Sequence, residues 1–265
     1  MYKKIVKLIP VVLVFLFSAC SLLPEKTDET KTWSAAKLYS EARDELTNGG
    51  YDKAIQYFEK LESRYPFGTY AQQAQMEIAY AYYRQGDQAQ ALAAVARFIK
   101  LHPNHPNVDY MYYLRGLINF NDRLGMFDFL IKQDPTERDP KAAREAFDAF
   151  KQLADRFPES IYTKDAISRM KYLVNAMAQY EVHVASYYYR RGAYLAAANR
   201  AQLAVKEYRE APSLEEALFI MVRSYDELAL TDLRDDAERV LKKNYPNSIF
   251  FRGGRVKDDP WWKLW

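Results

Sequence analysis

Few residues of this chain are of the types that do chemistry, and none stands in a motif that predicts a reaction. His102 and His105 form the one close histidine pair, but Pro103 separates them and no cysteine is near, so solvated loop histidines are expected rather than a metal site. His183 stands in a predicted helix among apolar and tyrosine side chains, which favours a packed histidine. No phosphate-binding glycine loop or nucleophile elbow occurs, and no carboxylate pair has a context that would raise its pKa. The sequence therefore predicts no catalytic residue, no metal and no cofactor.

The single cysteine, Cys20, has a different chemistry, because it follows an export signal. Lysines precede an apolar run at 8–17, which is too short to span a bilayer, for which about 20 residues are needed. Two small residues then stand before Cys20, an arrangement that resembles the bacterial lipobox. We expect residues 1–19 to be removed and Cys20 to carry S-diacylglycerol and an N-acyl chain such as palmitate, which together hold a protein in a membrane. Ser21, where aspartate would retain the protein in the inner membrane, favours the periplasmic face of the outer membrane of a Gram-negative bacterium.

The composition is that of a globular helical protein. Hydrophobic residues make up 49% and charged residues 28% of the chain, so a packed core is expected. Glycine is scarce, with 9 residues among 265, which favours helices over a β-sandwich. Removing the three lysines of the export signal from the 38 basic residues leaves 35, against 35 acidic residues, so the mature charge gives no reason to expect nucleic-acid binding.

A repeat with a period of 37 residues is the strongest signal. A glycine, an alanine and a proline recur at this spacing, with Gly49, Ala54 and Pro66 followed by Gly86, Ala91 and Pro103. The glycine turns the chain after one helix, the small alanine lets the next helix approach closely, and the proline stops that helix. The pattern resembles the tetratricopeptide repeat, a helix-turn-helix unit of about 34 residues. The sequence therefore predicts an all-α solenoid of about five such repeats.

Two stretches depart from this period. The third repeat, with helices expected at 107–124 and 139–157, is longer by about 18 residues, which we assign to an apolar loop at 125–138. That loop is either functional or folded back on its own repeat. Residues 163–191 hold no glycine or proline, which predicts a helix of about 43 Å that joins an N-terminal and a C-terminal half. The tryptophans of 261–265 end a tail that binds a partner, a membrane interface or its own last repeat.

These features divide the chain. The expected parts are a signal peptide (1–19), a lipidated cysteine with a flexible tether (20–33), repeats 1 to 3 (34–160), repeats 4 and 5 (161–246) and a Trp-rich tail (247–265). The fifth repeat is degenerate, which is typical of the unit that caps a stack.

Tyrosines crowd the predicted first helices of repeats two and three. Some of them must pack between repeats, but in such stacks the first helices line the concave face. Tyr80 and Tyr83 are three residues apart and so should share one stripe there, next to Arg84. Tyrosine offers apolar area at a low entropic cost, so we predict a groove for an extended peptide.

Several longer stretches resemble the BamD family of outer-membrane assembly lipoproteins, also called ComL or YfiO. They lie at 64–70, 108–116, 138–140 and 180–192 and at the Trp-rich end, and they are more specific than generic repeats. The likeness covers nearly the whole mature chain. It implies a non-enzymatic, helical component of the β-barrel assembly (Bam) complex, which folds and inserts outer-membrane proteins.

The resemblance also implies partners for each half. The family's N-terminal repeats receive unfolded outer-membrane proteins, and the matching positions here are Tyr65, Phe67, Gly68 and Tyr70. The family's C-terminal repeats hold the periplasmic domains of BamA, and Arg200 matches its contact arginine, although taken alone it would be a solvated helix charge. Other Bam lipoproteins would be further partners. Two functions of other kinds stay open, a scaffold for cell-wall or secretion machinery and a peptidoglycan hydrolase with unrecognised carboxylates.

Overall fold

The computed structural model describes residues 28–120 and 141–252, which are helical and contain no strand. The elements are α3 (Ala35–Thr47), α4 (Tyr51–Arg64), α5 (Thr69–Gln85), α6 (Gln88–Leu101), α7 (Val108–Asn119), α8 (Lys141–Arg156), α9 (Thr163–Arg190), α10 (Tyr194–Glu207), α11 (Leu214–Glu227), α12 (Thr231–Asn244) and the 3-10 helix η3 (Ile249–Arg252). The predicted all-α class is confirmed. Cys20, the loop at 125–138 and the tryptophans of 261–265 lie outside the described residues.

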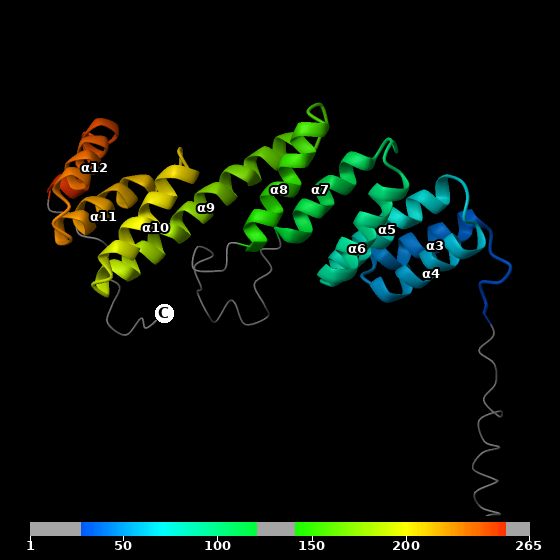
Figure 1. Ribbon diagram of the computed structural model, residues 1–265. Helices are drawn as coiled ribbons and strands as arrows, with labels where there is room; N and C mark the ends of the chain where they lie inside the picture. Colours follow the sequence, from blue (N-terminus) through cyan, green and yellow to red (C-terminus); the bar gives the residue numbers. More distant parts are fainter. Residues whose placement is uncertain (1–27, 121–140, 253–265) are drawn as a thin grey trace, which may run out of the picture.

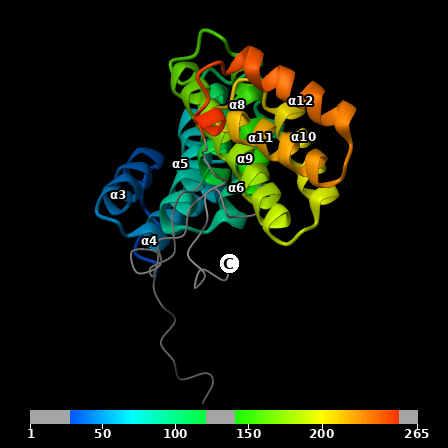
Figure 2. The ribbon, with the colours of Figure 1, turned by 90° about the vertical axis from the view of Figure 1, so that its left-hand side faces the viewer.

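The helices pair and stack in chain order, from α3 and α4 at one end to α11 and α12 at the other (Figure 1). First helices of neighbouring repeats also touch, α3 with α5, α5 with α7, and α9 with α11. Seen from the C-terminal end, α3 and α4 are offset sideways from α10, α11 and α12, so the stack does not run straight (Figure 2). The predicted solenoid of about five helix pairs is therefore confirmed.

Four repeats have a described turn after the first helix, and each turn passes through a residue with positive φ. Gly49, Gly86 and Gly192 have φ angles of 82°, 88° and 74°. At these turns the amides of the glycine and of the residue after it donate to carbonyls of the preceding helix, which satisfies its last turn. The fifth repeat has Ala229 in this place, with φ at 55°, although a Cβ makes that conformation unfavourable. The periodic glycine of the sequence is a requirement of the turn.

Four of the five second helices end where a proline is about to follow, and α10 is the exception, because Tyr208 after it precedes Arg209. Proline disfavours the helical conformation in the residue before it, so these four helices stop there. Residues in this position are Tyr65, His102, Phe157 and Tyr245. The chain makes the same turn after α6, α8 and α10. In each turn the first residue after the helix accepts, through its carbonyl, a hydrogen bond from the amide of the residue three positions later. Prolines therefore mark the ends of α4, α6, α8 and α12, with Pro66 and Pro103 as predicted, whereas α10 makes the same turn without one.

The long helix is part of a continuous core rather than a free rod. α9 has 28 residues and ends at Arg190, one residue earlier than expected, so it is about 42 Å long. It packs against α8, α10 and α11, and one cluster of buried side chains runs from Val108 to Leu241. The helix expected at 107–124 is seen at Val108–Asn119, with Asn107 and Phe120 as its caps, and 121–124 lie outside the described residues.

The flexible tether expected for 20–33 overlaps the folded part of the chain. Thr30 is only 3% exposed, and Asp28 accepts hydrogen bonds from Lys60 and Arg64 of α4. The Lys60 ammonium beside it holds the pKa of Asp28 well below its usual range. Residues 28–33 are therefore fixed on the first repeat, and the prediction that the tether extends to residue 33 is wrong.

Replacing Ala229 with glycine should raise the free energy of unfolding by about 0.5–1 kcal/mol, because glycine adopts positive φ without a steric cost. The opposite change at the equivalent turn, Gly192→Ala, should lower it by about 1 kcal/mol. Urea unfolding followed by circular dichroism measures both variants. A less stable Ala229→Gly protein would show that this turn carries no strain.

Candidate functional site

Aromatic side chains of α5, α7 and α9 form an array over the first helices of repeats two to four. The rings of Tyr80 and Tyr83 are 6.3 Å apart, so these two share one face of α5, as predicted. Across the neighbouring repeats, the ring of Tyr110 lies 5.6 Å from that of Tyr162. Tyr113 stacks on Tyr162 with 4.8 Å between centroids and 17° between planes. The rings of Tyr110, Tyr113 and Tyr162 therefore meet where repeats three and four adjoin, and the pair on α5 lies on the neighbouring repeat.

Hydrogen bonds fix the α9 end of the array. The hydroxyl of Tyr113 donates to Asp165 Oδ2 at 2.6 Å, and Arg169 Nε donates to the same oxygen at 2.5 Å. Burial, together with the bond to Asp165, raises the pKa of Tyr113 to about 12, so the hydroxyl stays protonated at neutral pH. Arg169 also lies over the ring of Phe120, 4.9 Å from its centroid. This arrangement offers rigid apolar faces with few polar groups, which suits an apolar peptide.

Arg84 lies at the other end of the array, on α5. Its Nη1 donates to the hydroxyl of Tyr80 at 2.8 Å, and its Cζ lies 5.7 Å from the Tyr80 centroid and 5.8 Å from the Tyr51 centroid. The hydrogen bond to Tyr80 raises the pKa of Arg84, so the guanidinium is charged. The structure therefore brings Tyr80, Tyr83 and Arg84 together.

The other predicted contact residues, Tyr65, Phe67, Gly68 and Tyr70, lie at the joint between α4 and α5, and we call them the aromatic corner. This joint is residues 65–68, two residues shorter than the joint 102–107 between α6 and α7. Gly68 has φ at 102° and ψ at 179°, a conformation that is essentially restricted to glycine. The short joint leaves Phe67 91% exposed.

The aromatic corner is held in place from both sides. The hydroxyl of Tyr65 donates to the carbonyl of Trp33 at 2.9 Å. The ring of Tyr70 lies 5.5 Å from that of Tyr39, which in turn contacts the buried Phe58. Because its neighbours are anchored, the joint that carries the exposed Phe67 is already ordered. A partner that binds Phe67 would therefore lose little further conformational entropy.

The seven predicted groove residues do not converge on one point. Tyr70 and Arg84 are 14 positions apart on α5, which is about 21 Å along the helix. Tyr70, Glu77 and Arg84 follow one another at a spacing of seven, so they lie on one stripe of α5. Arg43 of α3 forms an ion pair with Glu77 at the middle of the stripe. The residues predicted for a groove for an extended peptide thus lie along a strip, with aromatic groups at each end, which we call the α5 strip.

Arg200 is not the solvated helix charge that its sequence context alone suggested. Its Nη1 lies 2.9 Å from Glu181 Oε2 of α9, and the side chain of Glu181 is only 2% exposed. The hydrogen bond with Glu181 raises the pKa of Arg200. Arg200 itself is 42% exposed, so it neutralises a buried carboxylate and still reaches the surface.

Sequence reasoning missed Glu181. The signal was present, because this carboxylate interrupts the apolar stripe of α9, between Met177 and Ala178 on one side and Val182 and Ala185 on the other. A charged residue on a buried stripe requires a partner, and the partner comes from the next helix, α10. Only the packing of α9 against α10 identifies that partner as Arg200.

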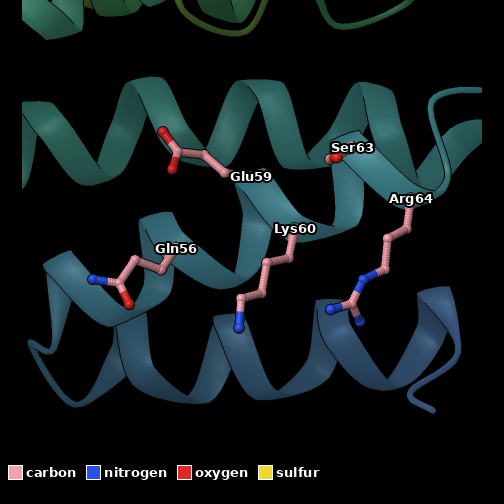
Figure 3. Close-up of a pocket in the computed structure, with 5 residues that line it drawn as sticks. All are labelled: Gln56, Glu59, Lys60, Ser63 and Arg64. Carbon is pink, nitrogen blue, oxygen red and sulfur yellow. The ribbon is translucent and has the colours of Figure 1, made fainter. Parts of the chain in front are cut away.

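A shallow hollow on α4 is already used by the chain itself. Gln56, Glu59, Lys60, Ser63 and Arg64 line it, and its volume is about 380 Å³ (Figure 3). Lys60 and Arg64 extend from α4 toward the N-terminal part of the chain and contact Asp28. Since both cations are neutralised there, we assign no ligand to the hollow.

The described part of the chain offers neither a metal site nor a membrane span. Within residues 28–120 and 141–252, no group of His, Cys, Asp or Glu side chains could hold a metal ion. His102 Nε2 lies 2.9 Å from Gln75 Oε1, and His105 Nδ1 accepts from the Asn107 amide. Over the same residues, every helix is too short or too polar to cross a bilayer.

Comparison with known proteins points to one family. The YfiO family profile, described as "Outer membrane lipoprotein", matches residues 31–241. A relative from Neisseria meningitidis serogroup A is 45% identical over 262 residues, which cover 97% of this chain and 98% of the relative. Relatives from Neisseria gonorrhoeae (47% over 237 residues, 89% of each chain) and Vibrio cholerae (38% over 230 residues, 86% of this chain and 94% of the relative) also match. All three are named outer membrane protein assembly factor BamD.

Solved structures give a much weaker likeness. The crystal structure of MamA aligns over 85% of this chain and 98% of its own, with a TM-score of 0.38 and 15% identity. That score is too low to carry an argument, and the fold rests on the helices described above.

Replacing Arg200 with alanine should lower the free energy of unfolding by about 1–3 kcal/mol, because it leaves the buried Glu181 carboxylate unpaired, an effect that water reaching Arg200 moderates. The double variant Arg200→Ala/Glu181→Gln should recover most of this loss. Arg239→Ala is the matched control, since its pair with Asp236 is exposed on both sides and contributes less than about 0.5 kcal/mol. Urea unfolding measures all three, and equal losses for Arg200→Ala and Arg239→Ala would contradict the buried pair.

Proposed function

Since the chain belongs to the YfiO family of outer membrane lipoproteins, we propose that it works in outer membrane protein assembly as a scaffold with two separate binding faces. It is a non-enzymatic assembly factor of the outer membrane of a Gram-negative bacterium, as its BamD relatives are. The family replaces the two other functions considered from the sequence, a cell-wall or secretion scaffold and a peptidoglycan hydrolase. The observation that carries the proposal is the separation of the α5 strip from Arg200 by the helices between α5 and α10 (Figure 1).

The α5 strip is the proposed face for unfolded outer-membrane proteins. An extended chain advances about 3.3 Å per residue, so about six residues would reach from Tyr70 to Arg84. In such a chain every second side chain points the same way, which matches aromatic groups at the two ends of the strip. Phe67 and Tyr83 would supply the apolar contacts, and no covalent chemistry is needed.

Arg200 is the proposed contact for the periplasmic domains of BamA. The buried carboxylate of Glu181 holds its guanidinium by one nitrogen, so the remaining N–H groups are free to bond an acceptor on a partner. A preordered arginine loses less entropy on binding than a mobile one. Glu181 therefore has a positioning role and does not itself touch the partner.

The proposed anchor is lipid on Cys20, with the repeats on the periplasmic face of the membrane. The fixed segment at 28–33 supports this arrangement, because it leaves only residues 20–27 between the lipid and the first repeat. Eight peptide links join Cys20 to Asp28 and reach at most about 29 Å, so the first repeat would lie close to the membrane surface. Other Bam lipoproteins are proposed to bind elsewhere on the same scaffold.

The double variant Tyr83→Ala/Arg84→Ala and the single variant Phe67→Ala should each weaken binding of an eight-residue β-strand peptide from an outer-membrane protein about tenfold, as loss of a hot-spot side chain does. A four-residue peptide cannot reach both ends of the strip. Its binding should therefore weaken only in the variant that alters the end where it binds. Fluorescence anisotropy measures binding, and circular dichroism checks that the helices remain. Tyr187→Ala, which removes an exposed tyrosine from the far end of α9, is the control. Equal binding by all variants would rule out the strip.

Arg200→Glu should abolish co-purification with BamA, because it replaces the contact charge. It also places a carboxylate beside Glu181, so the double variant Arg200→Glu/Glu181→Gln is needed to remove that internal repulsion. Co-purification from detergent-solubilised membranes should still fail with the double variant and should persist with Glu181→Gln alone. Recovery in the double variant would mean that Arg200 acts only within the chain.

A further inference from the structure

Two arginines lie against the ring of one tyrosine at the meeting of α7 and α8. Tyr112 is 5% exposed, and the Cζ of Arg115, one turn further along α7, lies 4.9 Å from its ring centroid. Arg156, the last residue of α8, has its Cζ 5.4 Å from the same centroid, and its Nη1 donates to the Tyr112 hydroxyl at 2.7 Å. Two positive charges thus contact one aromatic ring, and the charge of Arg156 acts on Arg115.

Neither charge is balanced by a carboxylate from the part of the chain that the structure describes. Among residues 28–120 and 141–252, Arg115 and Arg156 form no ion pair, whereas Arg64, Arg97 and Arg169 each have one. Arg115 Nη2 donates to a neutral acceptor, Gln152 Oε1, at 2.7 Å. Its Nε is fully buried and has no hydrogen-bond partner. Burial, and secondarily the charge of Arg156, lower the pKa of Arg115, although a guanidinium remains protonated at neutral pH.

This arrangement costs stability as it stands. Like charges at short range repel each other, and a buried N–H without an acceptor loses its bond to water without replacement. An oxyanion that accepts hydrogen bonds from the outer nitrogens of both guanidiniums would offset the repulsion between them. The planar forks of arginine match a carboxylate in two parallel hydrogen bonds.

We propose that Arg115 and Arg156 form a binding site for a carboxylate side chain of a protein partner. The rings beside the arginines favour a protein acid over a free ion, because Phe157 lies 5.5 Å from Tyr112 and adds apolar contact area. A polyanion such as nucleic acid is disfavoured, because the mature chain has balanced charge and offers it no extended basic surface.

The site is separate from the aromatic array. Tyr113, the residue after Tyr112, stacks on Tyr162 in the array, and successive residues of a helix point about 100° apart. Tyr112 and Arg115 are three residues apart and therefore share a different side of α7. A partner at this site would leave the α5 strip and Arg200 open, so three partners could bind one chain.

The test compares two acetylated peptides, Phe-Glu-Phe and Phe-Gln-Phe, by isothermal titration against the full chain. The carboxylate peptide should bind about tenfold more tightly, as expected for a charge-assisted bond. Arg156→Gln should remove that difference, and Arg144→Gln, a change at an exposed arginine of the same helix, should keep it. Equal affinity for both peptides, or an unchanged difference in Arg156→Gln, overturns the proposal.

A second measurement keeps the site testable if Arg115→Gln fails to fold. In the unaltered chain, the NMR signal of the buried Arg115 Nε–H should shift on adding the glutamate peptide and stay in place with the glutamine peptide. Displacement of the glutamate peptide by an equal concentration of inorganic phosphate would overturn the choice of a carboxylate. The double variant Tyr83→Ala/Arg84→Ala should bind the glutamate peptide normally, which separates this site from the α5 strip.

Discussion

The structure depends on one constraint, which is that no helix pair can bury its apolar stripe alone. Ala54, Ala91 and Ala197 occupy the same place in three repeats and are completely buried, so their helices approach closely. Larger side chains such as Phe58, Phe98 and Phe150 then fill the contacts between neighbouring helices and are likewise buried. Each repeat is therefore stable only against the next one, and stacking produces long continuous surfaces without a closed pocket.

Such surfaces suit a protein that holds others. The first helices touch one another across repeats, so their tyrosines meet to form an array that no single repeat contains. The joints add a second kind of surface, since a short joint with Gly68 exposes Phe67 while its neighbours stay packed. Rigid apolar groups at fixed distances can bind many sequences of similar pattern, as the proposed binding of unfolded proteins would require.

Charged residues make up 28% of the chain, and the surroundings of a few arginines and lysines are informative. Lys60 and Arg64 are satisfied by Asp28 and fix the N-terminal segment. Arg200 is satisfied by a buried carboxylate and is thereby oriented at the surface. Arg115 and Arg156 have no such partner within the described residues, although a carboxylate there would stabilise the fold. Two positive charges without a counter-charge, in a chain whose net charge is close to zero, are most simply explained by a partner that supplies the counter-charge.

The sequence by itself determined the repeat, because its glycines, alanines and prolines each answer a local requirement of the backbone: a positive φ, a close approach or a helix end. It also determined that Tyr80, Tyr83 and Arg84 lie together, since helical spacing alone places them on one face. Only the tertiary structure decided that Tyr65 beside the exposed Phe67 bonds to Trp33 and that Arg200 neutralises Glu181. Those facts depend on contacts between residues far apart in the chain, and local propensity carries no information about which side chain of a neighbouring helix a residue will meet.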